Sequence, residues 1–64
     1  MFTETDLNDR FTIIQNASLG DAEILNEKYG KLLSASYNDE ERKQYRLLRN
    51  NTLVRINQLT QKSR

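Results

Sequence analysis

The side chains best suited to do chemistry in this sequence are bases and amides gathered near its carboxyl end. Residues 42–64 hold seven Lys or Arg and six Asn or Gln, and they contain no Asp or Glu. Bases bind phosphates and carboxylates, and amides bind peptide groups or the edges of nucleic-acid bases. The segment is therefore suited to contact a nucleic acid, or an acidic surface of this chain or of another protein.

Groups that perform catalysis are scarce. The chain has no His and no Cys, which removes the commonest general base, the thiol nucleophile and most ligands of transition metals. The carboxylates of residues 39–41 and the pair Lys31 and Ser34 are better explained as helix capping and solvated surface. Residues 6–9 lack the Gly and the distal Glu of a calcium loop, and no Gly-rich phosphate loop is present. We expect no enzymatic activity, no cofactor, no metal and no small-molecule substrate.

Chain length limits how these groups can be positioned. The 64 residues make one domain at most, and a chain this short buries only about 60% of its unfolded surface. Disulfides and zinc sites cannot compensate, because Cys and His are absent. Self-association or a bound partner remains as a source of stability. We predict a single domain over residues 1–64 that forms a homo-oligomer.

The amino-terminal segment and the lengths of the apolar runs indicate the expected cellular compartment of the protein. Residues 1–10 are acidic where a targeting sequence is basic, and no apolar run approaches the eighteen or so residues of a membrane span. The lack of Cys gives no reason to place the chain in an oxidising compartment. We expect a soluble, cytoplasmic protein without membrane contact. Its size and composition are also common among accessory proteins of phages and mobile elements, an association without a physical basis.

Apolar periodicity predicts an all-α protein of three helices. The chain has no Pro, only two Gly and no strand-like alternation between turns. A short helix is expected over about residues 5–16, a middle helix over about 21–36 and a long basic helix over about 39–61. They would form a small bundle, or a helical hairpin plus a third helix.

Each predicted helix has an apolar stripe and a capping residue. Gly30 lies off the stripe of the middle helix, where it either admits a close backbone or is a tolerated defect that costs about 1 kcal/mol. Residues 50–52 are poor helix formers and mark a candidate weak point. The expected caps are Thr3 or Thr5, Ser18 or Asp21, and Asn38 in a capping box with Glu41. The expected core residues are Leu7, Phe11, Ile14, Ala22, Leu25, Tyr29, Leu32, Leu33, Tyr45, Leu48, Thr52, Leu53, Ile56 and Leu59.

Two aliphatic residues of the third helix fall opposite its core stripe. Leu47 and Val54 are seven residues apart, or about two helical turns, where a surface helix usually carries polar side chains. They are either two isolated exposed aliphatics or a second contact with another chain. We name the candidate partner-binding surface around them the Leu47 face, and it comprises Lys43, Arg46, Leu47, Asn50, Val54, Asn57 and Gln61.

The two parts of the chain carry opposite charge. Residues 1–41 hold nine acids and three bases, a net charge of −6, whereas residues 42–64 have a net charge of +7. Arg42 and Arg49 fall beside the apolar stripe of the third helix, where long bases lay their stems on the core and reach a carboxylate. We expect them to pair, within the chain or between subunits, with acids of the earlier helices: Asp6, Asp9, Glu23 or Glu27.

Two functions fit these features. The first is a protein-binding module, such as an inhibitor, adaptor or assembly factor, that presents the Leu47 face to a protein with an acidic surface. The alternative is a regulator that binds nucleic acid through the same helix. We favour the first because the net charge is only +1 and because Tyr45, the one aromatic residue of the tail, lies on the core stripe. The link before the third helix also lacks the Gly of a typical helix-turn-helix.

Overall fold

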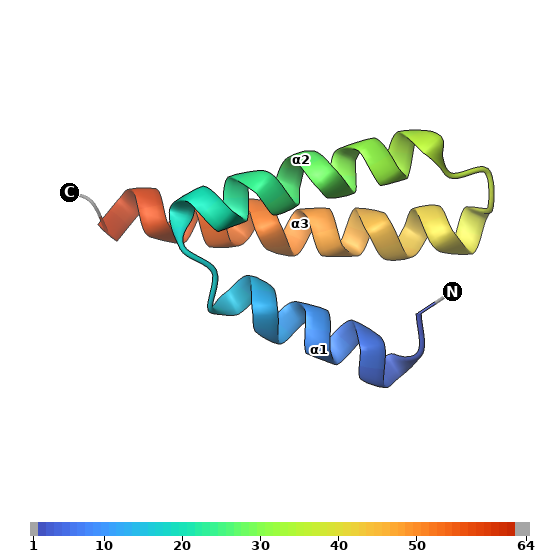
Figure 1. Cartoon of the computed structure of the whole chain (residues 1–64), viewed down its shortest axis with the longest axis horizontal. Coiled ribbons are helices and arrows are strands. Elements are labelled where there is room, and N and C mark those ends of the chain that lie inside the picture. Colours follow the sequence, from blue (N-terminus) through green and yellow to red (C-terminus); the bar gives the residue numbers. More distant parts are fainter. Residues whose placement is uncertain (1, 63–64) are drawn as a thin grey trace.

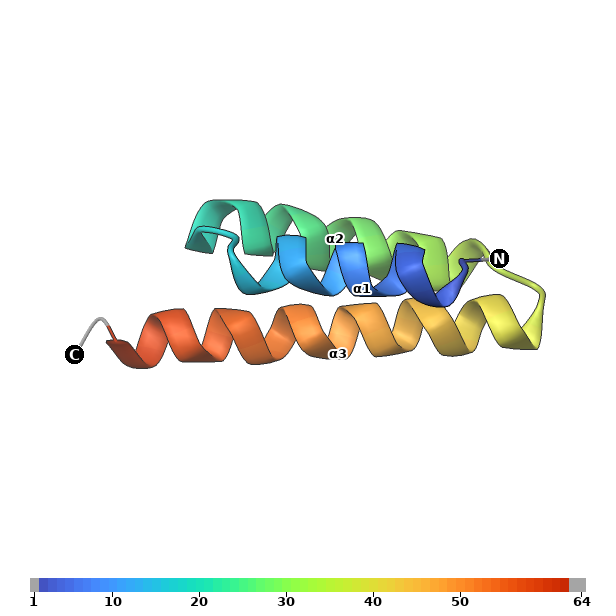
Figure 2. The same cartoon turned by 90° about the horizontal axis from the view of Figure 1, so that it is seen from below.

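The chain folds into two layers of helices, with one long helix supporting two shorter ones. A computed structural model describes the backbone of residues 2–62 and the side chains of residues 2–61. The helices are α1 (Glu4–Gln15), α2 (Leu19–Ala35) and α3 (Asp39–Lys62), so the predicted all-α, three-helix fold is confirmed. Figure 1 shows α3 between α2 and α1, and Figure 2 shows α1 and α2 on the same side of α3. Both short helices pack on α3, and they contact each other much less.

The amino terminus of α1 is fixed by a capping box. The hydroxyl of Thr3 accepts a hydrogen bond from the N–H of Asp6 at 3.2 Å, and the N–H of Thr3 donates to the Asp6 carboxylate at 3.3 Å. The two bonds satisfy two groups that the first turn of a helix leaves free. Of the two predicted caps, Thr3 is therefore the one used, and not Thr5.

Side chains also cap the other two helices. The Ser18 hydroxyl accepts from the N–H of Asp21 at 3.3 Å, so Ser18, and not Asp21, is the N-cap of α2. The side-chain oxygen of Asn38 accepts from the N–H groups of Glu40 and Glu41, at 2.8 and 3.3 Å. The predicted cap at Asn38 is confirmed, whereas the hydrogen bonds of the described residues do not include the return bond from Glu41 that a capping box requires. Three acidic residues follow at the positive end of the α3 dipole.

The hydrophobic core lies where the three stripes meet. Its buried centre is formed by Ile14 of α1, Tyr29 of α2 and Leu48 of α3. Partly buried apolar side chains surround the centre: Phe2, Leu7, Phe11, Leu25, Leu32 and Tyr45. The prediction for Leu53 was wrong, because its side chain is 43% exposed. The buried side of α3 is centred on Leu48 and its neighbours one turn along, and Leu53 is turned away from it.

The middle of α3 is continuous where a weak point was predicted. The helix runs unbroken through residues 50–52, and Thr52 is fully buried with its hydroxyl donating to the carbonyl of Leu48 at 2.8 Å. Gly30 of α2 is likewise unexceptional, because a Cβ there would meet only Arg49 Nε, at 3.8 Å. No backbone approaches closely, so the tolerated-defect explanation of Gly30 is correct.

The start of α1 is fastened to α3 by one side chain and an aromatic cluster. The amide of Gln44 accepts from the N–H of Phe2 and donates to its carbonyl, each at 3.1 Å. The Phe2 ring meets Tyr45 edge to face, with centroids 5.7 Å apart, and the Arg10 guanidinium lies 4.1 Å from the Phe2 centroid. These contacts fix the direction in which α1 crosses α3.

The turn between α1 and α2 is fastened to α3 as well. Arg55 is half-buried on the inner side of α3, and its Nε donates to the carbonyl of Ala17 at 3.0 Å. Ala17 itself is buried. A charged donor at this position satisfies a backbone group of the turn that has no helical partner. Arg55 therefore holds together the end of the α1–α2 layer where the two helices meet.

Candidate protein-binding faces

The Leu47 face lies exposed along α3. All seven of its residues are exposed, including Leu47 at 46% and Val54 at 56%. The two aliphatic side chains are about two turns apart on one side of the helix. A single partner can therefore cover both of them while it contacts the polar residues between them.

Leu47 borders α1 and does not stand apart from it. With Leu7, Glu40, Lys43 and Gln44 it lines an open groove of 320 Å³ between α1 and α3. Leu7 packs on the core at the base of this region. The apolar surface thus continues from Leu47 onto α1, and a partner that covers Leu47 also reaches the edge of Leu7.

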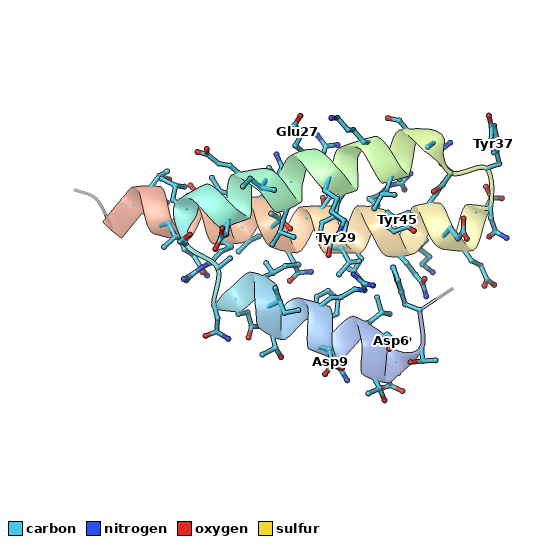
Figure 3. All side chains as sticks on the ribbon, viewed as in Figure 1. Asp6, Asp9, Glu27, Tyr29, Tyr37 and Tyr45 are labelled. Carbon is cyan, nitrogen blue, oxygen red and sulfur yellow. The ribbon has the colours of Figure 1, made fainter. Side chains whose placement is uncertain are left out.

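The bases of α3 within residues 42–61 form no ion pair with any acid that the structure describes. Among the side chains of residues 2–61 there is one ion pair, Lys31–Glu27 at 3.2 Å, and it lies within α2. The predicted pairing of Arg42 and Arg49 with acids of the same chain is therefore wrong. Burial of the α1 and α2 stripes turns the acids outward, and Figure 3 shows Asp9 and Glu27 at opposite edges of the molecule. The acids expected to pair within the chain were Asp6, Asp9, Glu23 and Glu27.

Three arginines follow one another along α3. Arg42, Arg46 and Arg49 are spaced i, i+4 and i+7, all are exposed, and they share one side of the helix. Beside them, Arg49 and Lys31 line an open groove of 560 Å³ between α3 and α2. Glu27 lines the same groove and pairs with Lys31, so the basic character of this groove is reduced.

A second apolar surface lies in the α1–α2 layer. Ile24 and Ile13 are the most exposed aliphatic side chains of the described residues, at 65% and 60%. They line an open groove of 540 Å³ with Thr12, Asn16, Ala17, Asp21 and Leu25. Every lining residue belongs to α1, to α2 or to the turn between them, whereas the residues of the Leu47 face all lie on α3.

This second surface follows from two pairs of adjacent aliphatic residues. Neighbours along a helix point about 100° apart, so both members of Ile13–Ile14 or of Ile24–Leu25 cannot face the same core. Ile14 is buried and Leu25 is half-buried, and Ile13 and Ile24 are left exposed. The signal is present in the sequence, but a search for core stripes does not detect it.

Charges of both signs flank Ile24. Asp21 lines the 540 Å³ groove on one side of it. On the other side, Lys28 lines a second open groove of 410 Å³ with Ile24, Leu32 and the ion-paired Glu27 and Lys31. Neither Asp21 nor Lys28 has an ion-pair partner among residues 2–61. We name this surface the Ile24 face, and it comprises Ile13, Ala17, Asp21, Ile24, Leu25 and Lys28.

Comparisons with known proteins add no functional assignment. No family model, curated protein or solved structure matches the chain. Within the part of the chain that the structure describes, no helix is both long and apolar enough to cross a membrane. The same residues contain no group of three or more His, Cys, Asp or Glu that could hold a metal ion. The exposed faces are therefore the features of the chain that bear on its function.

Proposed function

We propose that the protein is a non-catalytic binding module that presents the Leu47 face to another protein, as an inhibitor, adaptor or assembly factor. The observation that supports this function is that α3 exposes Leu47 and Val54 beside bases that no described acid neutralises. Covering the aliphatic side chains removes apolar surface from water, and an acidic partner supplies the missing charge.

The geometry of α3 suggests how such a partner is contacted. Leu47 and Val54 are about 10 Å apart along the helix axis, so they act as two anchors in one apolar groove of the partner. Lys43 and Arg46 lie at the rim, where they meet carboxylates and steer the encounter. Asn57 extends the contact with hydrogen bonds to peptide groups.

A paired substitution tests this function. Leu47→Asp combined with Val54→Asp places two charges at the anchors and leaves the core side of α3 unchanged. The full-length chain serves as bait in nuclease-treated lysate of its native host, and captured proteins are identified by mass spectrometry. The wild-type chain is expected to retain a specific protein that the double variant loses.

Leu53→Asp is the matched control, because Leu53 is 43% exposed on another side of the same helix. It is expected to retain the captured protein, and circular dichroism should show equal helix content in all three chains. Retention of the protein by the double variant, or equal loss by Leu53→Asp, would contradict the proposal.

The arginine stripe supports a second candidate, which is nucleic-acid binding. Arg42, Arg46 and Arg49 are exposed and unpaired on one side of α3, as phosphate contacts require. In a DNA titration, the logarithm of the association constant would then fall against the logarithm of salt concentration by about 0.9 per neutralised phosphate. Arg46→Ala would lower that slope by about one contact. Binding that hardly responds to salt favours the protein partner.

A further inference from the structure

We propose that two copies of this chain associate through their Ile24 faces, with the two α2 helices antiparallel about a two-fold axis that passes between Ile24 and Leu25. The occupant of the α1–α2 groove is thus a second copy of the same chain. This inference goes beyond the proposed function, because the Leu47 face lies in the other layer and stays free for a different partner.

The apolar part of the contact is supplied by the two exposed isoleucines of each copy. Ile24 of one copy enters the 540 Å³ groove of the other, between Ile13, Ala17 and Leu25 of the partner subunit. The two-fold axis repeats this insertion in the opposite direction. Ile13 and Ile24, now 60% and 65% exposed, are removed from water in both copies by a single interface.

The charged part of the contact identifies the partner as a second copy. Asp21 precedes the proposed axis by as many residues as Lys28 follows it. In the antiparallel dimer Asp21 therefore faces Lys28 of the partner subunit, and Lys28 faces the partner's Asp21. Two ion pairs form from side chains that have no partner within residues 2–61. A parallel arrangement would instead bring like charges together at both ends.

The small core gives the association a physical reason. Three residues, Ile14, Tyr29 and Leu48, form the buried centre of the hydrophobic cluster, while Ile13 and Ile24 remain in water. Domains of this size commonly gain the stability they lack through oligomerisation. An interface on the α1–α2 layer extends the apolar interior without changing the fold of either copy.

Charge exchange tests the proposed pairing. Asp21→Lys and Lys28→Asp each place like charges at both ends of the interface, whereas the double variant Asp21→Lys/Lys28→Asp restores two pairs with their signs reversed. Sedimentation equilibrium of the full chain from micromolar to millimolar concentration should show a wild-type dimer. The dissociation constant of the dimer should be about tenfold or more higher for each single variant than for the wild type. For the double variant it should lie within about threefold of the wild-type value.

A control variant on the same helix distinguishes the loss of the interface ion pairs from the effect of a change in net charge and from a loss of folded protein. Glu23→Lys, exposed on α2 and outside the Ile24 face, should leave the dissociation constant unchanged. Asp21 lies in the first turn of α2, so Asp21→Lys also replaces a favourable interaction with the positive end of the helix dipole by an unfavourable one. The double variant carries the same Lys, so recovery of the dimer in it cannot come from better folding.

Three results would overturn the inference. The first is a wild-type chain that stays monomeric over the whole concentration range. The second is a double variant with wild-type circular dichroism that is no more associated than the single variants. The third is a dimer that Leu47→Asp/Val54→Asp abolishes and that Asp21→Lys does not affect.

Discussion

The Ile24 face and the Leu47 face each expose two aliphatic side chains, but they differ in the charges around them. Asp21 and Lys28 are equally far from the midpoint between Ile24 and Leu25, with the acid on one side along α2 and the base on the other. Leu47 and Val54 are accompanied on their face by two bases, Lys43 and Arg46, and by amides. The first face is electrostatically complementary to a rotated copy of itself, and the second is complementary only to a surface that carries acids.

The difference indicates how one short chain can present two separate contacts. A face with both signs arranged about a centre favours self-association, and a face with one sign disfavours it because like charges would meet. The two faces share no residue: the Leu47 face lies on α3, whereas the Ile24 face lies on α1, α2 and the turn between them, which Figure 2 shows above α3. Substitutions that act on one layer should therefore affect one contact, and those that act on the core should remove both.

The largest expected effect comes from Leu48→Ala, which should unfold the chain and so abolish binding through both faces. Leu48 is fully buried at the point where the three helices meet. Deleting its side chain costs about 2 to 5 kcal/mol, a large part of the stability of a domain this small. Urea titration followed by circular dichroism should show a chain that is mostly unfolded at 25 °C. Leu53→Ala, at a side chain 43% exposed, should cost less than about 1 kcal/mol.

A smaller effect, confined to one layer, is expected from Arg55→Met. The substitution keeps the apolar stem of the side chain and removes the bond to the Ala17 carbonyl, which lowers the free energy of unfolding by about 1 to 2 kcal/mol. Amide hydrogen exchange should accelerate more over residues 14–22 than over residues 43–54. The dimer should weaken while the Leu47 face keeps its partner. The exposed Arg46→Met should leave exchange in both segments unchanged, and uniform acceleration in Arg55→Met would argue against separate layers.

The smallest effect is expected from Gly30→Ala, which should raise the stability of the fold and leave binding through both faces unchanged. The added Cβ would make ordinary contact with Arg49 Nε, at 3.8 Å, and Ala is favoured over Gly in a helix interior by about 0.5 to 1 kcal/mol. Thermal unfolding should shift upward with no change in the dimer dissociation constant. Gly20→Ala, in the first turn of α2 where no atom lies within 4 Å of the added Cβ, should give a smaller gain. A lower melting temperature for Gly30→Ala would show that the helices pack more closely at this position.

The helices and their inner stripes were predictable because the signals are local. Thr3, Ser18 and Asn38 cap the first turns, and the spacing of Ile14 and Tyr29 with their neighbours follows the helical period. Exposure of the Leu47 face could be predicted for the same reason, since its residues lie off the core stripe.

Contacts between helices could not be predicted in the same way. The approach of Leu47 to Leu7, and the inward position of Arg55, depend on the angle at which α1 crosses α3. The two hydrogen bonds between Gln44 and the backbone of Phe2 help to set that angle, and they join residues 42 positions apart in the chain. Charge totals gave the wrong expectation of a pair within the chain for Arg42 and Arg49, because net charge does not specify the side of a helix on which an acid lies.

Mixing the two single charge variants is the sharpest test of the antiparallel dimer through the Ile24 faces. Asp21→Lys carries two bases on its Ile24 face and Lys28→Asp carries two acids, so each alone should sediment as a monomer at a concentration where the wild-type chain is dimeric. Combined in equal amounts, they should form a one-to-one heterodimer, because every opposed pair is then an acid and a base. A mixture that remains monomeric, or single variants that dimerise as well as the wild type, would contradict the account.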